Sequence, residues 1–181
     1  MPHAARPSTA ASTARNTGTA ARSTTRSSGT DAVKLLKDDH KEVKSLFREY
    51  DKLAKAEDES REDLAREICA MLTVHATVEE EIFYPSAREV LDDKDLSLVD
   101  EAAVEHATAK DLIAQIEASS CDSDLYDAKM KVLSEYVDHH VKEEEEELFP
   151  KVKKAGLDTK AVGAELAERK EALTAQQADG H

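Results

Sequence analysis

The sequence predicts an all-α protein: an up-down four-helix bundle with a disordered N-terminal tail and a short C-terminal helix. The first observation behind this prediction is composition, because the 181 residues include only 5 glycines and 4 prolines, and 35% are charged. Such a composition favours helix over sheet. The second observation is the helical spacing of apolar residues from Asp31 onward, and the third is an internal repeat of two helix pairs. Aromatic residues make up only 4% of the chain, so we expect a mainly aliphatic core.

The acidic character of the chain limits the classes of partner. The formal net charge is −14 at pH 7, whereas nucleic-acid and anionic membrane surfaces are recognised by clustered lysine and arginine. No stretch approaches the roughly 20 apolar residues that a membrane helix needs. We therefore expect no nucleic acid and no membrane as partners, and favour small molecules, metals or a protein that the sequence does not name.

Residues 1–30 contain mostly Ala, Ser, Thr and Arg, with four arginines and no acid, and cannot bury a core. This segment resembles an organelle transit peptide but lacks the leucines or aromatics of an apolar helix face, so a flexible tail is the favoured interpretation. We expect the bundle over residues 31–154 and a C-terminal helix and tail over residues 155–181.

The two cysteines, Cys69 and Cys121, stand alone and form no CxxC pair. They indicate neither a zinc knuckle nor a secreted disulfide framework, and Cys69 lies among apolar residues as a packing residue would. A reducing cytoplasm is therefore the expected location.

Capping residues and helix breakers suggest the bounds of each helix. The first is expected over residues 31–56, capped by Thr30 or Asp31, and the second over residues 60–85, where Ser60 and Asp63 resemble a capping box. Pro85 should kink or end that helix. The remaining helices are expected over residues 95–118, over residues 123–154 with a kink at Pro150 and a stop at Gly156, and, more weakly, over residues 158–175.

The predicted helices fall into two similar pairs. The segment beginning Asp39-His40 resembles the segment beginning Glu105-His106, since both read acid-His-x-x-x-Lys-x-Leu. HATVEEEIFYP, residues 75–85, resembles HVKEEEEELFP, residues 140–150: both have His-x-x-x-Glu-Glu-Glu, a phenylalanine near the end and a closing proline. The chain thus looks like a duplicated helical hairpin with pseudo-twofold symmetry.

Four histidines, one in each predicted helix, lie in the apolar stripes, and two of them have a glutamate four residues later on the same helix face. Borderline metals such as iron, manganese, zinc or cobalt accept this mixture of donors. Six ligands suit two metals, each held by three, with the two carboxylates bridging and positions left for water and a small diatomic or peroxide ligand. The candidate metal ligands are His40, His75, Glu79, His106, His140 and Glu144.

A lone histidine on an apolar stripe is usually a hydrogen-bonded core residue. Four at repeated positions, two with a companion glutamate, fit that explanation poorly, because burying two carboxylates without a cation costs several kcal/mol. The other glutamates of the two acidic runs should be solvated, with one possible hydrogen bond to a ligand imidazole. His139 is roughly 100° away from His140 around the helix and should be exposed or should support a ligand through a hydrogen bond. The terminal His3 and His181 should be inert. Tyr136 is a candidate donor to a bound peroxide, although ordinary half-buried packing is the favoured interpretation.

These residues resemble the hemerythrin-like proteins, the HHE cation-binding family, across residues 31–154. The resemblance rests on the pattern His…His-x-x-x-Glu…His…His-x-x-x-Glu, with each second element ending in an aromatic residue and proline. It implies a four-helix bundle with a non-haem di-iron centre held by the six candidate ligands. Oxygen-carrying hemerythrins have a further histidine where this chain has Lys110, which argues against reversible oxygen carriage.

The resemblance implies two non-haem iron ions as cofactors, with manganese or zinc as alternatives. The leading hypothesis is a protein that binds or reacts with O2, NO or H2O2 for sensing or detoxification, including a catalase-like activity, so enzyme status stays open. The alternative is a non-enzymatic oxygen-binding, iron-buffering or sensor module. A metal-free structural bundle is a third reading, which the buried carboxylates oppose.

Overall fold

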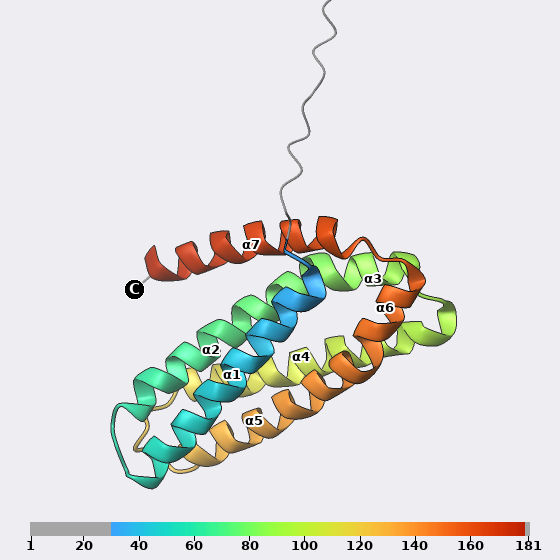
Figure 1. The fold of residues 1–181 in the computed structure, drawn as a ribbon. Coiled ribbons are helices and arrows are strands. Elements are labelled where there is room, and N and C mark those ends of the chain that lie inside the picture. The colour runs from blue at the N-terminus through green and yellow to red at the C-terminus, as the bar shows by residue number, and fades with distance from the viewer. Residues whose placement is uncertain (1–29, 180–181) are drawn as a thin grey trace, which may run out of the picture.

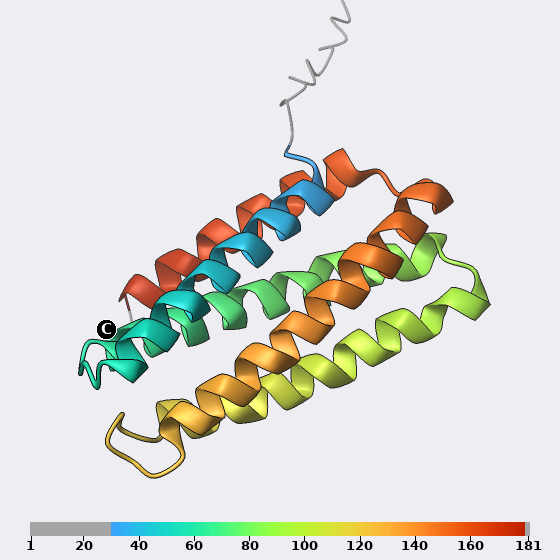
Figure 2. The same ribbon diagram turned by 60° about the horizontal axis from the view of Figure 1, so that its bottom comes forward.

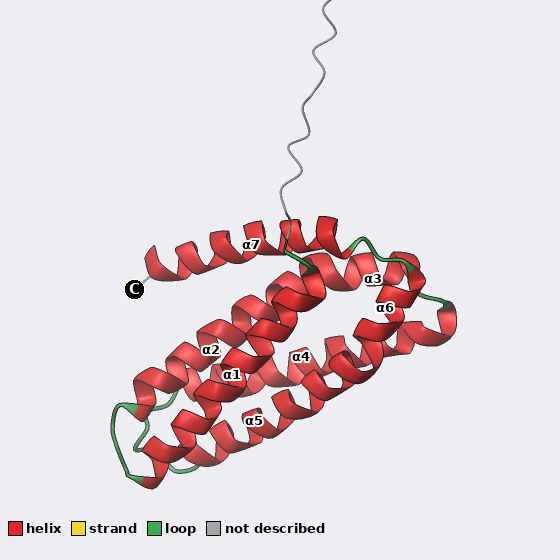
Figure 3. Ribbon diagram, in the orientation of Figure 1, coloured by secondary structure: helices red, strands yellow, loops and turns green. Residues whose placement is uncertain are grey.

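The structure is a computed structural model that describes residues 30–179, and every regular element in this range is helical (Figure 3). The predicted all-α class is confirmed. The expected disordered tail lies outside the described residues except for Thr30. The α-helices are α1 (Ala32–Lys55), α2 (Arg61–Val78), α3 (Tyr84–Val90), α4 (Leu96–Glu117), α5 (Tyr126–Glu143), α6 (Phe149–Ala155) and α7 (Thr159–Asp179).

The helices form two hairpins and one covering helix. Helix α1 pairs with α2, and α4 pairs with α5, and these hairpins pack into a four-helix bundle (Figure 1). Helix α7 is longer than the sequence suggested, and it packs along the outside of α1 and α2 (Figure 2). None of the helices within residues 30–179 is both long and apolar enough to cross a membrane.

The helix starts differ in detail from the prediction. Asp31, not Thr30, caps α1, since its side chain accepts a hydrogen bond from the Lys34 backbone N–H at 3.0 Å. The expected capping box of Ser60 and Asp63 is wrong. Ser60 makes no capping bond to α2; its backbone N–H and its hydroxyl donate instead to the Asp58 carboxylate at 2.9 and 2.7 Å.

The helix predicted to stop or kink at Pro85 continues past it to Val90. The chain is π-helical immediately before the proline, over Glu79–Phe83, and the same widened turn, Glu144–Leu148, precedes Pro150. In each segment the last donor reaches back five residues, from Tyr84 N–H to the Glu79 carbonyl in the first. The proline follows at once, so its missing N–H falls where the α-helical bonding pattern is already interrupted. Gly156 then ends α6 with φ of 93°, as its position predicted.

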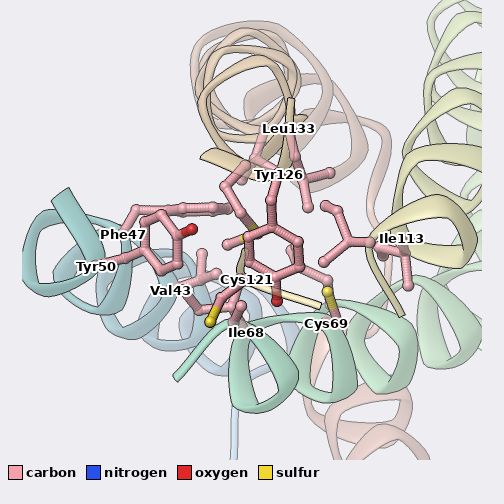
Figure 4. Packing of buried hydrophobic residues seen from close by; sticks show 14 of the residues in the cluster. Val43, Phe47, Tyr50, Ile68, Cys69, Ile113, Cys121, Tyr126 and Leu133 are labelled. Atoms are coloured by element: carbon pink, nitrogen blue, oxygen red, sulfur yellow. The ribbon is translucent and has the colours of Figure 1, made fainter. Parts of the chain in front are cut away.

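Two apolar layers fill the bundle. The layer near the α1–α2 loop includes Val43, Ile68 and Tyr126 (Figure 4), and the layer near the prolines includes Leu36, Phe83 and part of α7. The core is richer in rings than expected, because six of the seven aromatic side chains are buried and only Tyr136 is exposed. The four histidines of the repeat lie where the helices pass from one apolar layer to the other, so a polar layer separates the two.

Cys69 belongs to the first of these layers and is fully buried. Burial raises the pKa of its thiol to about 12, which removes the thiolate that redox chemistry requires. The interpretation of this cysteine as a packing residue is confirmed.

Candidate metal centre

The structure brings all six predicted ligands together in the polar layer. The histidines come one each from α1, α2, α4 and α5, and the glutamates are the first residues of the two π-helical segments. None of the six is more than 7% exposed. They form two overlapping groups of ligand atoms, each within 4.8 Å: His40, His75, Glu79 and Glu144, and Glu79, His106 and His140.

The imidazoles face one another through their Nε2 atoms. These atoms are 3.2 Å apart in the pair His40–His75 and 3.1 Å apart in the pair His106–His140. One oxygen of Glu79 lies 3.2 Å from Nε2 of His75 and 3.4 Å from Nε2 of His106. This carboxylate therefore spans the two histidine pairs, as a bridging ligand would.

The second carboxylate occupies the equivalent place from the opposite side. An oxygen of Glu144 lies 3.4 Å from Nε2 of His40 and 3.6 Å from Nε2 of His140. The two glutamates thus stand in the symmetric arrangement that the repeat predicted.

The carboxylates provide a test of whether metal fits here. Both oxygens of Glu79 and one oxygen of Glu144 are buried without a hydrogen-bond partner. Burial, and then repulsion by Glu144, raises the pKa of Glu79 to about 7. Unpaired buried carboxylates cost several kcal/mol, and cations among the converging nitrogens and oxygens would offset that cost. The donor set fits iron, manganese, zinc or cobalt better than calcium or magnesium, which prefer oxygen alone.

An acidic side chain holds the outward nitrogen of every imidazole. A carboxylate accepting from Nδ1–H fixes the tautomer and leaves the Nε2 lone pair facing inward. The Nδ1-to-oxygen distances are 3.0 Å for His40 with Glu145, 3.4 Å for His75 with Asp39, 3.1 Å for His106 with Glu80 and 2.8 Å for His140 with Glu105.

These four acids were only partly foreseen. The sequence led us to expect at most one glutamate of the acidic runs beside an imidazole. Glu80 and Glu145 both accept from an imidazole Nδ1–H, and each directly follows a candidate ligand glutamate. Asp39 and Glu105 were missed as imidazole partners. The available sign was the acid that precedes the first histidine in both copies of the repeat.

Three of the four acids pair in turn with a lysine. Lys110 donates to both oxygens of Glu80 at 2.7 and 2.6 Å, Lys37 lies 3.2 Å from Glu145, and Lys170 of α7 donates to Asp39. Lys110 therefore supports an imidazole partner and lies outside the group of ligand atoms. Glu105 differs from the other three, because its neighbour is His139, whose Nε2 lies 3.3 Å away.

Tyr84 lies at the centre, although the sequence pattern did not single it out. Its hydroxyl donates to the Glu144 carboxylate at 3.1 Å and lies 3.3 Å from Nε2 of His106. Burial raises the pKa of Tyr84 well above its usual value, so the hydroxyl keeps its proton. Tyr136, the tyrosine considered from the sequence, is 42% exposed and only lines the cavity beside the centre.

This cavity of about 40 Å³ lies between the helices on the side of the centre away from the prolines. That volume exceeds the roughly 10–15 Å³ that one water needs, so a diatomic or peroxide molecule fits. Beyond the imidazoles the walls are mainly apolar, including Val43, Met71, Leu72, Ile113 and Val137.

The geometry defines a metal-binding helical bundle, and comparison with known proteins gives its family. Residues 31–152 match the hemerythrin HHE cation binding domain, and the chain belongs to this family. It resembles the crystal structure of a hemerythrin HHE cation binding domain-containing protein from Mycobacterium kansasii with a TM-score of 0.68 and 21% identity, over 81% of this chain and 89% of the other. That likeness confirms the fold.

A curated relative is the DNA nickase of Nostoc sp. (strain PCC 7120 / SAG 25.82 / UTEX 2576). It is 30% identical over 120 residues, which are 66% of this chain and 32% of the relative. The chain thus spans about a third of that protein's length.

Proposed function

We propose that His40, His75, Glu79, His106, His140 and Glu144 hold two non-haem iron ions, with manganese or zinc as alternatives. We propose further that the protein binds or reacts with O2, NO or H2O2 for sensing or detoxification. One observation carries the proposal: buried carboxylate oxygens without a hydrogen-bond partner stand among four inward-facing imidazole nitrogens.

When bound, an iron pair supplies electrons by changing between its ferrous and ferric states. The protein supplies charge, orientation and a mainly apolar cavity beside the centre. Glu79 and Glu144 neutralise part of the cation charge, and the acid at each Nδ1 keeps the imidazoles in the tautomer that binds metal. The apolar cavity favours small uncharged molecules over ions.

Tyr84 is the proton donor closest to the ligands. Its hydroxyl keeps its proton and donates a hydrogen bond to one oxygen of Glu144, which holds that oxygen in place. Tyr136 lines the cavity and Tyr84 does not, so we propose Tyr136 as the tyrosine that a small molecule in the cavity would contact and Tyr84 as the residue that orients Glu144.

Metal analysis tests the first part of the proposal. Protein produced with iron should contain about two irons per chain, one for each of the two overlapping groups of ligand atoms. The variant His140→Ala should lose iron, whereas His139→Ala, which removes the exposed neighbouring imidazole, should keep both ions. Wild-type protein without any bound transition metal would refute the proposal.

Reaction with peroxide separates a catalyst from a binding module. Rapid oxygen evolution from H2O2 by the iron-loaded protein, lost in His140→Ala, would support a catalase-like activity. Reversible spectral change with O2 or NO and no peroxide turnover would support the non-enzymatic alternative. The ion pair of Lys110 with Glu80 favours reactivity over carriage, because the position of the carriers' extra histidine supplies no ligand here.

The Nostoc relative raises DNA nicking as a second activity to examine. We do not propose it for this chain, because the formal charge of −14 disfavours a DNA surface and the match covers about a third of that relative. Metal-loaded protein should leave supercoiled plasmid intact, and conversion to open circles that His140→Ala abolishes would contradict this view.

A further inference from the structure

A second group of potential metal ligands lies on the surface, outside the centre already described. Nε2 of His139 is 3.3 Å from an oxygen of Glu105 and 3.3 Å from an oxygen of Glu143. The three ligand atoms lie within 4.8 Å of one another. The His139 side chain is 61% exposed, so the group is open to solvent. One imidazole nitrogen with two carboxylates is a donor set that divalent first-row transition metals accept.

Glu105 connects this surface group to the buried centre. One of its oxygens faces His139, and the other accepts from Nδ1 of His140 at 2.8 Å. A single carboxylate therefore contacts an exposed imidazole and the imidazole of a proposed ligand. No other acid at the four Nδ1 positions has a histidine as its second neighbour among the described residues.

Two cavities continue the connection inward. A surface hollow is lined by Glu105, His139 and Glu143 together with three further residues of α4. A smaller cavity of about 10 Å³ is lined by Glu105, Glu143, His140 and Glu144 and by three apolar residues, Leu98, Ala102 and Leu148. The two cavities share Glu105 and Glu143, and Glu144 has a buried oxygen without a hydrogen-bond partner. Carboxylate oxygens therefore line both the surface hollow and the smaller cavity beside the centre.

The duplicated half of the molecule shows that the centre itself does not need this surface group. The positions equivalent to His139 and Glu143 are Val74 and Val78, both buried. Helix α7 packs over that half, and its Lys170 neutralises Asp39, the equivalent of Glu105. Both halves offer the same buried ligands, so the extra imidazole and carboxylate on the α4–α5 hairpin lie outside the repeated ligand set.

We propose that Glu105, His139 and Glu143 form an exposed binding site for a divalent first-row transition metal ion, from which the ion passes inward to the buried centre. The surface site stands on its own geometry, and the delivery step rests on the proposed function. The ion keeps its charge and oxidation state throughout, exchanging water for carboxylate and imidazole ligands.

The test uses the full chain depleted of metal and titrated with Co2+ by equilibrium dialysis. Wild-type protein should bind two ions tightly and a third more weakly. The double variant His139→Gln/Glu143→Gln should bind the third ion at least about tenfold more weakly, since even partners of metal ligands change affinity by that factor. Glu105 is left intact because it also contacts His140. The matched control is Glu101→Gln, which removes one charge from the same hollow without removing a ligand of the group.

Stopped-flow mixing with Co2+ measures the delivery step through the visible absorption of the buried ions. The double variant should load the centre at least about tenfold more slowly and reach the same two ions, while Glu101→Gln should load as wild type does. Absence of a third ion in wild-type protein would overturn the surface site, and equal loading rates would overturn delivery. Binding at the surface alone, with no buried ions, would retain the site but contradict both delivery and the proposed function.

Discussion

The two hairpins of the bundle share an interior and differ in their exteriors. Each contributes two histidines and one glutamate to the centre, with an acid at every Nδ1. Helix α7 covers the α1–α2 hairpin (Figure 2), whereas on the α4–α5 hairpin Val104 is 68% exposed and stands near the open group of His139 and Glu105. The same ligand residues are therefore found beneath two different exteriors. The repeat determines the centre, and the packing of α7 determines which hairpin is open to solvent.

Metal removal should have the largest effect on this comparison. At free metal 1,000 times the dissociation constant, each bound ion stabilises the fold by about 4 kcal/mol, so chelation should lower the free energy of unfolding by at least that amount. Hydrogen exchange should then show a greater loss of protection in α4–α5 than in α1–α2, because α7 still holds the latter pair together. Equal loss in both hairpins would contradict the stabilising role assigned to α7.

Removing the apolar anchor of α7 should have the next largest effect. Leu166 is fully buried against the bundle, and Leu166→Ala should cost about 3 kcal/mol in a denaturant titration. The rate of hydrogen exchange in α1 and α2 should rise towards the rate in the α4–α5 hairpin, which α7 does not cover. Leu173→Ala, at a half-buried position on the same helix, is the matched control and should cost less. A greater loss for Leu173→Ala would show that the helix is anchored elsewhere.

The acids at Nδ1 permit a comparison of equivalent positions. Asp39→Asn and Glu105→Gln should each lower metal affinity by about tenfold or more, because each weakens the hold on a proposed ligand histidine. The Glu105 change should have the greater effect, since its contact with His140 is 2.8 Å and that of Asp39 with His75 is 3.4 Å. Equilibrium dialysis of both variants measures the order, and the reverse order would show that Lys170 contributes more than contact distance does.

Exchange of aromatic residues between the halves should have the smallest effect. The repeat aligns Tyr84 with Phe149, so Tyr84→Phe copies the second half into the first. Loss of the buried hydrogen bond to Glu144 should cost about 1 kcal/mol while both metal ions stay bound. Thermal unfolding and metal analysis together test this expectation. Loss of one ion would mean that Tyr84 belongs to the ligand set itself.

The sequence was sufficient for the class of fold and for the residues that meet at the centre. Helical spacing determines which side chains share a face, and the repeat doubles that information, so His140 could be distinguished from His139 and Glu144 from its neighbours. Burial and convergence of all six residues follow the prediction. Their role as metal ligands stays a prediction that metal analysis can decide.

Features that depend on tertiary packing were missed. Helical periodicity indicated no partner for α7, whose docking depends on the surface that α1 and α2 form together. Gly163 allows α7 to approach the start of α1 closely, because a Cβ there would lie 1.9 Å from the Thr30 carbonyl oxygen. In the sequence it was merely a glycine inside a weak helix. Tyr84 was missed for a similar reason, because periodicity places a side chain on a face but does not say what its hydroxyl will meet.

The two π-helical segments determine the direction in which the following aromatic residue points relative to the ligand histidine. The aromatic residues are Tyr84 and Phe149. Each segment lies after the ligand histidine and before the aromatic residue that precedes proline. Deletion of one residue there would allow α-helical bonding but rotate everything beyond it by about 100°. Tyr84 would then turn away from Glu144 although His75 had not moved. Length changes are thus excluded from the middle of these helices, while the loops between hairpin arms remain free to vary.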